Sequence, residues 1–156
     1  MGIDPNQLRS LIIQPALQAI GLWTPAAEQL VLGTACQESM CGTYIKQLGK
    51  GPALGIYQME PATHNDLHVN FLAFKRDLNV KVNNLSLGIA KAEELIWNLN
   101  YATAMCRVHY FRIKAPLPAV HDIRAQARYW KKYYNTHLGA GTEEEYLKNW
   151  ERYSGE

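Results

Sequence analysis

The sequence lacks any run of about 18 consecutive apolar residues, the length that a membrane-spanning helix requires. We therefore expect no stable insertion into a membrane. The opening stretch "MGIDPNQLRS" also lacks the basic start and apolar core of a secretory signal peptide. Work outside the cytoplasm would then require a route other than signal-peptide export.

The sequence has little net charge and few cysteines. Sixteen basic residues face fourteen acidic ones, for a net charge of +2, which gives no reason to expect a nucleic-acid partner. The three cysteines, Cys36, Cys41 and Cys106, match no zinc-binding spacing. An odd count without an export signal favours free core thiols, although a Cys41–Cys106 disulfide stays open. We expect no metal ion and no other cofactor.

The composition is that of an ordinary globular protein. Hydrophobic residues make up 47% and charged residues 19% of the 156 positions, and no repeat or linker interrupts them. This length suits one domain with a substantial hydrophobic core. We therefore expect a single domain over residues 1–156.

Helix signals recur along the chain. Asp4-Pro5 and Thr24-Pro25 each pair an N-cap residue with a proline at the first helical position, and Thr142 with Glu145 makes a capping box. Hydrophobic periodicity and end signals predict helices over about 5–20 with a kink or break at Pro15, 25–41, 61–67, 86–112, 121–136 and from 143 onward.

One segment differs from this helical pattern. Glycines and a proline punctuate "TYIKQLGKGPALGIYQ", which predicts a loop or a small hairpin. The expected fold class is therefore α+β, predominantly α, with a small β-hairpin or irregular insertion after the second helix.

Glu38 lies at the end of an otherwise apolar helix. Ala27, Val31, Thr34 and Glu38 are spaced i, i+4, i+7 and i+11, which places all four on one buried face. Burial and the negative end of the helix dipole both disfavour a carboxylate, so they raise its pKa. A carboxyl group that is protonated near neutral pH can act as a general acid. The alternative is a glutamate at a frayed helix end that faces solvent or pairs with an arginine.

The stretch "GPALGIYQMEPATHNDL" begins shortly after Glu38. Gly55 permits a close backbone approach or an unusual dihedral angle. Tyr57 and Gln58 then supply a flat ring and an amide, which suit the apolar faces and hydroxyl groups of a sugar. Alone, this motif has little specificity.

Together these motifs resemble those of the lytic transglycosylase and goose-type lysozyme family, over roughly residues 24–150. The resemblance rests on Glu38-Ser39 at a helix end, on 55–58 followed by a proline and a threonine, on the later helix "NLNYATAMCRVHYF", and on Tyr134-Asn135. Two departures stand out: Tyr57 replaces the usual methionine, and Thr136-His137 replaces alanine-glycine.

The resemblance implies a lysozyme-like fold that binds peptidoglycan glycan strands. It implies that Glu38 is the catalytic acid. The substrate-binding residues that it implies are Ser39, Tyr57, Gln58, Met59, Tyr134 and Asn135. Periodicity independently places Tyr134 on the inward stripe of Ile123, Ala127 and Trp130, where its hydroxyl needs a partner. A hydrogen bond to Glu38 would satisfy both groups, and a backbone carbonyl is the alternative.

The implied reaction is cleavage of the β-1,4 bond between N-acetylmuramic acid and N-acetylglucosamine. In a lytic transglycosylase, the glutamate first protonates the glycosidic oxygen and then accepts a proton from the muramyl C6 hydroxyl, which gives a 1,6-anhydro product. A hydrolytic lysozyme would instead use a second carboxylate. Glu60 is the best candidate for this second carboxylate, whereas we expect Asp66 and Asp77 to cap helices or face solvent.

Two other classes remain open. A non-catalytic glycan-binding or structural virion protein could keep the same scaffold without chemistry. His64 and His68 are four residues apart, as in helical zinc sites, but a metal peptidase lacks support because no glutamate follows His64 and no third ligand is evident. A wall-cleaving domain without an export signal suggests a bacteriophage protein that acts on the cell wall in the periplasm, delivered by a virion or released at lysis, with other virion or lysis proteins as partners. A bacterial protein or a fragment of a larger one fits the residues equally well.

Overall fold

The computed structural model describes residues 2–88 and 90–156, and it is predominantly helical, as the sequence predicts. The helical segments, of which η1 and η3 are π-helical and η2 is a 3-10 turn, are α1 (Pro5–Gln7), η1 (Leu8–Ile13), α2 (Gln14–Ala19), α3 (Pro25–Ser39), α4 (Pro61–Asn70), η2 (Leu72–Phe74), α5 (Arg76–Asn83), α6 (Glu94–Trp97), α7 (Leu99–Phe111), α8 (Ile123–Trp130), η3 (Lys131–Asn135) and α9 (Glu143–Tyr153).

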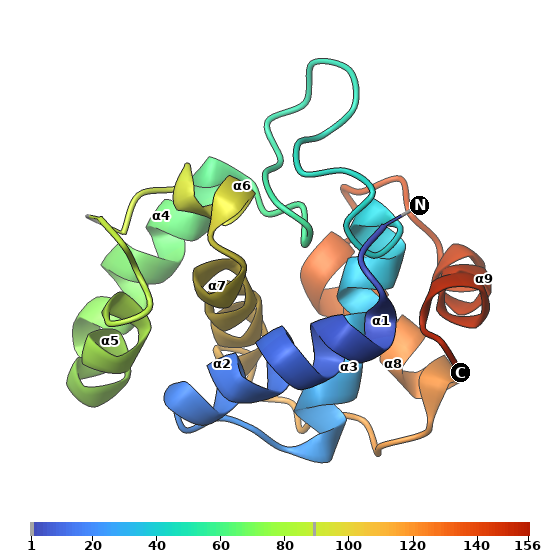
Figure 1. Cartoon of the computed structure of the whole chain (residues 1–156), viewed down its shortest axis with the longest axis horizontal. Helices are drawn as coiled ribbons and strands as arrows, with labels where there is room; N and C mark the ends of the chain where they lie inside the picture. Colours follow the sequence, from blue (N-terminus) through green and yellow to red (C-terminus); the bar gives the residue numbers. More distant parts are fainter. Residues whose placement is uncertain (1, 89) are drawn as a thin grey trace.

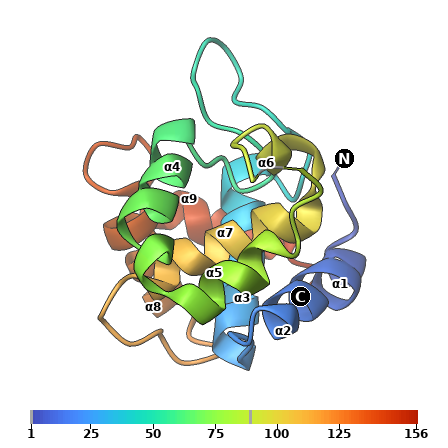
Figure 2. The same cartoon turned by 90° about the vertical axis from the view of Figure 1, so that its left-hand side faces the viewer.

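Helices α3 and α7 form the centre of the molecule. Helices α8 and α9 pack against α3, while α4 and α5 pack against α7 on the other side (Figure 1). Figure 2 shows α4 and α5 in front of α7 when the molecule is viewed from that side. The central helices are buried around most of their circumference, which explains the nearly continuous apolar residues of α3. The predicted stripe of Ala27, Val31 and Thr34 is fully buried.

The three predicted N-caps are confirmed. The side chain of Thr24 accepts a hydrogen bond from the backbone N–H of Ala27 at 3.0 Å, and Asp4 caps α1 in the same way. Thr142 and Glu145 form the complete capping box of α9. At Pro15 the chain stays helical, because the wider π-helical turn η1 directly precedes it and joins α1 to α2.

The single long helix predicted over 86–112 is wrong. Position 89 lies outside the described residues, and the rest of the range forms a loop followed by α6 and α7. The Glu94 carboxylate accepts hydrogen bonds from the Ser86 hydroxyl at 2.6 Å and from the Leu87 N–H at 2.8 Å, which stabilises the loop. Asn98 then caps α7 by accepting from the Tyr101 N–H, so a new helix begins there.

The insertion between α3 and α4 is irregular. It projects from the helical body (Figure 1) and carries isolated antiparallel bridges, Lys46 with Leu54 and Leu54 with Met59. Among the described residues no strand forms, so the hairpin expected as one alternative is absent there and the irregular alternative is correct.

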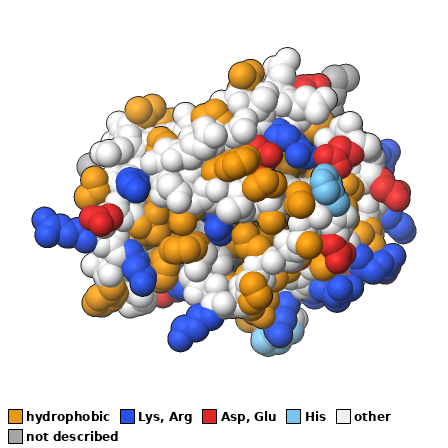
Figure 3. Space-filling view, turned by 90° about the horizontal axis from the view of Figure 1, so that it is seen from below, with side chains coloured by type: hydrophobic (Ala, Val, Ile, Leu, Met, Phe, Trp, Pro, Cys, Tyr) orange, Lys and Arg blue, Asp and Glu red, His pale blue; other side chains and the backbone are white. Residues whose placement is uncertain are grey.

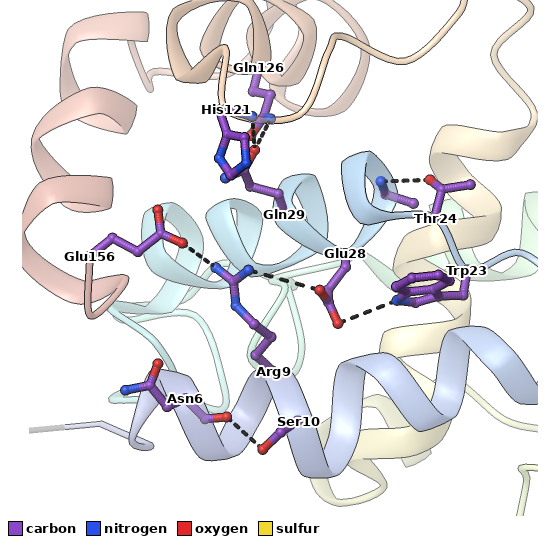
Figure 4. Close-up of polar contacts among 11 residues, drawn as sticks. Asn6, Arg9, Ser10, Trp23, Thr24, Glu28, Gln29, His121, Gln126 and Glu156 are labelled. Carbon is purple, nitrogen blue, oxygen red and sulfur yellow. Dashed lines mark hydrogen bonds and ion pairs between the residues drawn. The ribbon is translucent and has the colours of Figure 1, made fainter.

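Close packing joins α3 to α9. A Cβ added at Gly33 would lie 1.9 Å from the hydroxyl oxygen of Tyr146, so only glycine permits this approach. At the other edge of α3, the guanidinium of Arg9 on η1 lies between Glu28 and Glu156, and the Trp23 indole donates to Glu28 (Figure 4). These contacts connect α3 to residues near both ends of the sequence.

The surface and the cysteines agree with the composition. On the face seen from below, hydrophobic side chains are interspersed with basic and acidic ones (Figure 3).

Cys36, Cys41 and Cys106 are buried free thiols, so the Cys41–Cys106 disulfide does not form. Within the described residues, no helix has the length and apolar character needed to cross a membrane.

Candidate active site

A cleft of about 630 Å³ lies where the end of α3, the 47–66 segment, the end of α7 and the 134–140 segment meet. This volume lies within the usual range of small-molecule binding sites. The residues that line it are Glu38, Gln47, Ala53, Gln58, Met59, Glu60, Ala62, Thr63, Asp66, His109, Arg112, Tyr134, Asn135, Thr136, Leu138, Gly139 and Ala140.

Glu38 contributes its carboxyl group to this cleft from the last turn of α3. Burial raises its pKa from an ordinary 4.5 to about 7, although a hydrogen bond from Trp130 opposes the shift. No ion pair with a lysine, arginine or histidine involves Glu38 among the described residues, so no cation compensates for the lost hydration. Near neutral pH, a large fraction of this carboxyl group is protonated.

Trp130 holds the Glu38 carboxyl group in place. Its indole Nε1 donates a hydrogen bond to Glu38 Oε1 at 2.9 Å, and the indole ring is fully buried. The predicted hydrogen bond from Tyr134 to Glu38 is wrong: the Tyr134 hydroxyl donates to the Tyr57 carbonyl at 2.6 Å, which was the alternative. Trp130 lies on the same helical stripe as Tyr134, and a buried indole N–H needs an acceptor, so the sequence did contain a signal for this contact.

Ser39 and Tyr57 do not line the cleft, although we expected both to contact substrate. The Ser39 hydroxyl is fully buried and donates to the Ile56 carbonyl at 2.6 Å, which ties the end of α3 to the 55–58 turn. The Tyr57 ring points into the core, where its hydroxyl lies 2.8 Å from that of Thr103. These two residues position the motifs that carry Glu38 and Gln58.

The 54–59 turn brings Gln58 and Met59 to the cleft wall. Gly55 has a φ of +78°, and a Cβ there would lie 2.0 Å from the Leu95 carbonyl oxygen, so both reasons proposed for a glycine at this position hold. Gln58 also has a positive φ of 49°, a strained conformation for this residue type that is often found at functional sites. Its side-chain amide donates to the Gly55 carbonyl at 3.0 Å. Glu60 follows on the same wall, exposed to solvent.

The opposite wall begins with η3, which carries Tyr134 and Asn135. Lys131 organises the loop that follows: its ammonium group donates to the Asn135 side chain at 2.7 Å, to the Thr136 carbonyl at 3.0 Å and to the Gly139 carbonyl at 3.1 Å. One half-buried cation thus fixes three positions of the cleft rim. Short π-helical segments such as η3 are rare and are frequent at functional sites.

Three cleft residues were missed or misjudged from the sequence. His109 and Arg112 lie three residues apart at the end of α7 and so share a face, a spacing that could have been noticed. Asp66 was expected to cap a helix or face solvent. It is solvent-exposed but also lines the cleft, where it forms an ion pair with Arg112.

The two histidines considered as zinc ligands have protein partners. The Nε2 atoms of His64 and His68 each lie 2.7 Å from the Tyr101 hydroxyl, which can donate to one ring and accept from the other. In the described part of the chain, no cluster of three or more His, Cys, Asp or Glu side chains is placed to hold a metal ion.

The sequence matches no protein-family model, and comparisons with curated proteins and with solved structures also give no match.

Proposed function

We propose that this protein cleaves peptidoglycan glycan strands, with Glu38 as the general acid, on a lysozyme-like fold. The observation that carries the proposal is a partly buried carboxyl group with a pKa of about 7 that has no ion-pair partner among the described residues and is open to a cleft of sugar-unit size. Such a group can protonate a glycosidic oxygen at neutral pH. The rest of the cleft offers the side-chain amides of Gln58 and Asn135 and the aromatic ring of Tyr134.

The mechanism begins when neutral Glu38 protonates the oxygen between N-acetylmuramic acid and N-acetylglucosamine. The bond breaks, and positive charge develops at the muramyl anomeric carbon. Glu38, now a carboxylate stabilised by the Trp130 indole N–H, accepts the proton of the muramyl C6 hydroxyl. That oxygen closes onto the anomeric carbon, which gives the 1,6-anhydro sugar without a water molecule or a second carboxylate.

Hydrolysis is the second candidate, because Glu60 lies on the wall of the same cleft. In that case Glu60 would activate a water molecule that attacks the anomeric carbon. The lyase route is preferred because it needs only the carboxyl group whose environment is suited to the chemistry. Asp66 is less suitable as a base, because hydrogen bonds from Arg112 and Asn70 lower its pKa.

The test is the clearing of a suspension of purified sacculi by wild type, Glu38→Gln and Glu60→Gln. Wild type should clear the suspension, and Glu38→Gln should lose at least about a hundredfold of the rate, as for loss of a catalytic acid. Equal clearing by Glu38→Gln would reject catalysis by this residue, and binding of sacculi without clearing by wild type would favour the non-catalytic protein. Loss of clearing in Glu60→Gln would favour hydrolysis.

A further inference from the structure

The wall of the cleft formed by α4 and the end of α7 carries polar groups that glycosidic cleavage does not use. Arg112 Nη1 donates to Asp66 Oδ2 at 2.5 Å, and Asn70 Nδ2 donates to the other oxygen of Asp66 at 2.6 Å. Because Asp66 is held from both sides, it orients the guanidinium group at the edge of the cleft.

His109 adds a polar atom without a partner. Its Nδ1 is buried and has no hydrogen bond among the described residues, while its ring packs against that of Tyr134 at 4.8 Å between centroids. Because no acceptor lies beside this buried nitrogen, the N–H of the neutral ring is better placed on Nε2, which is the nitrogen left to bond a ligand in the cleft. Burial and the nearby Arg112 lower the pKa of His109 to about 4, so the ring is neutral and retains one N–H donor.

Arg112 also keeps unused donors. A guanidinium group has five N–H bonds in a planar fork, and within the described chain Asp66 is the one side chain that accepts from it. The side chain is about one-third exposed, at 30%, and it lines the cleft that contains Glu38. A planar fork with free N–H groups, next to a neutral imidazole donor, matches a carboxylate.

We propose that Arg112 and His109 form a subsite for a carboxylate of the peptide that peptidoglycan carries on its muramyl residues. This inference rests on the proposed function and adds to it, because the sugars of a peptide-bearing strand are themselves uncharged. The subsite shares one cleft with Glu38, so the carboxylate it binds belongs to a substituent of the strand being cleaved. The enzyme would then prefer peptide-bearing strands with free carboxylates.

The experiment compares two batches of one sacculus preparation, both acetylated on free amines, of which one has its carboxylates converted to amides with carbodiimide and ammonia. Rates of muropeptide release are measured for wild type, Arg112→Gln, Asp66→Asn and Arg124→Gln. Arg124 is the matched control, since it is an exposed arginine whose nearest acidic partner, Glu144, lies 4.0 Å away outside the cleft.

Wild type should release products from the carboxylate batch at least about tenfold faster than from the amide batch. Arg112→Gln should lose most of that ratio, and Arg124→Gln should keep it. Asp66→Asn should increase it, because the asparagine oxygen can still accept from the guanidinium group while a competing negative charge is removed. Circular dichroism checks the fold of each variant.

Equal rates for wild type on the two batches, an unchanged ratio in Arg112→Gln, or a lower ratio in Asp66→Asn would overturn the subsite while leaving the cleavage function intact. The Asp66→Asn result decides the matter should Arg112→Gln fail to fold. No release by wild type from either batch would instead overturn the proposed function, and the subsite with it.

Discussion

At the scale of single residues, the proposed chemistry depends on the environment of Glu38. The carboxyl group is removed from water at the end of α3 and receives one neutral hydrogen-bond donor, Trp130. Desolvation favours the neutral acid, whereas the indole N–H favours the carboxylate. The balance leaves Glu38 able both to give and to take a proton near neutral pH.

Replacing Trp130 tests this balance. Trp130→Phe removes the donor that lowers the pKa of Glu38, so that pKa should rise above its wild-type value of about 7. Activity requires the protonated acid and falls as pH rises through this pKa, so the alkaline limb of the kcat/KM profile should move to higher pH. The control is Trp97→Phe, which changes an exposed tryptophan. An alkaline limb that stays at its wild-type position in Trp130→Phe would contradict the account.

The same pKa predicts how stability depends on pH. Because the folded-state pKa of Glu38 is raised from 4.5 to about 7, the folded protein binds its proton more tightly, and this contribution is present below about 4.5 and lost as pH rises through 7. The loss is at most about 3 kcal/mol. Glu38→Gln cannot ionise, so urea unfolding should show it to be more stable than wild type at pH 8.5 and similar at pH 4.5. A variant less stable than wild type at the higher pH would argue against a desolvated carboxylate.

At the scale of elements, the 54–59 turn and the 136–140 loop shape the cleft. Gly55 meets both demands on a glycine: it has a positive φ, and its backbone lies against the Leu95 carbonyl. Gly49 has the same φ of +78° but has no atom within 4 Å of an added Cβ. The two positions therefore separate backbone strain from steric overlap.

Gly55→Ala should lower the free energy of unfolding by about 3 kcal/mol, since strain and overlap add. Gly49→Ala should lower it by only about 1 kcal/mol, from backbone strain alone. Chemical denaturation of both variants measures the difference. Equal losses would mean that the contact between the turn and α6 is not tight.

Lys131 makes a second prediction at this scale. Lys131→Met removes three hydrogen bonds to the cleft rim, so amide hydrogen exchange should accelerate over residues 136–140 while the helices stay protected. Lys132→Met is the control, because Lys132 is exposed and lies over the ring of Tyr133. If amide hydrogen exchange over residues 136–140 were the same in Lys131→Met as in wild type, Lys131 would not be the residue that organises this loop.

Some features of these elements could be predicted from the sequence, and others could not. Caps such as Thr24 and the stripe that ends at Glu38 depend on neighbours a few residues away, so they were predictable. The break between α6 and α7 was not, because Asn98, which caps α7, also donates to the carbonyl of Leu85, a residue far from it in the sequence. The hydrogen bond from Tyr134 to Tyr57 and the Arg112–Asp66 ion pair join segments that are far apart in the sequence. Helical periodicity predicts which face of a helix is buried but not which residue that face contacts.

At the scale of the whole molecule, the buried helix α3 carries Glu38 to the cleft, and Trp130 of α8 holds its carboxyl group there. The Ser39–Ile56 hydrogen bond joins the end of α3 to the turn that carries Gln58, and the Tyr134–Tyr57 bond joins η3 to the same turn. Motifs scattered from 38 to 135 therefore form one structure around Glu38.

Mass spectrometry of the soluble products from purified sacculi tests the central claim most directly. Incubation with wild type should yield muropeptides that end in 1,6-anhydro-muramic acid, and incubation with Glu38→Gln should yield none above background. Reducing-end muramic acid would contradict the lyase route. The absence of any wild-type product, or the same products from Glu38→Gln, would contradict the assignment of Glu38 as the proton donor that breaks the glycan strand.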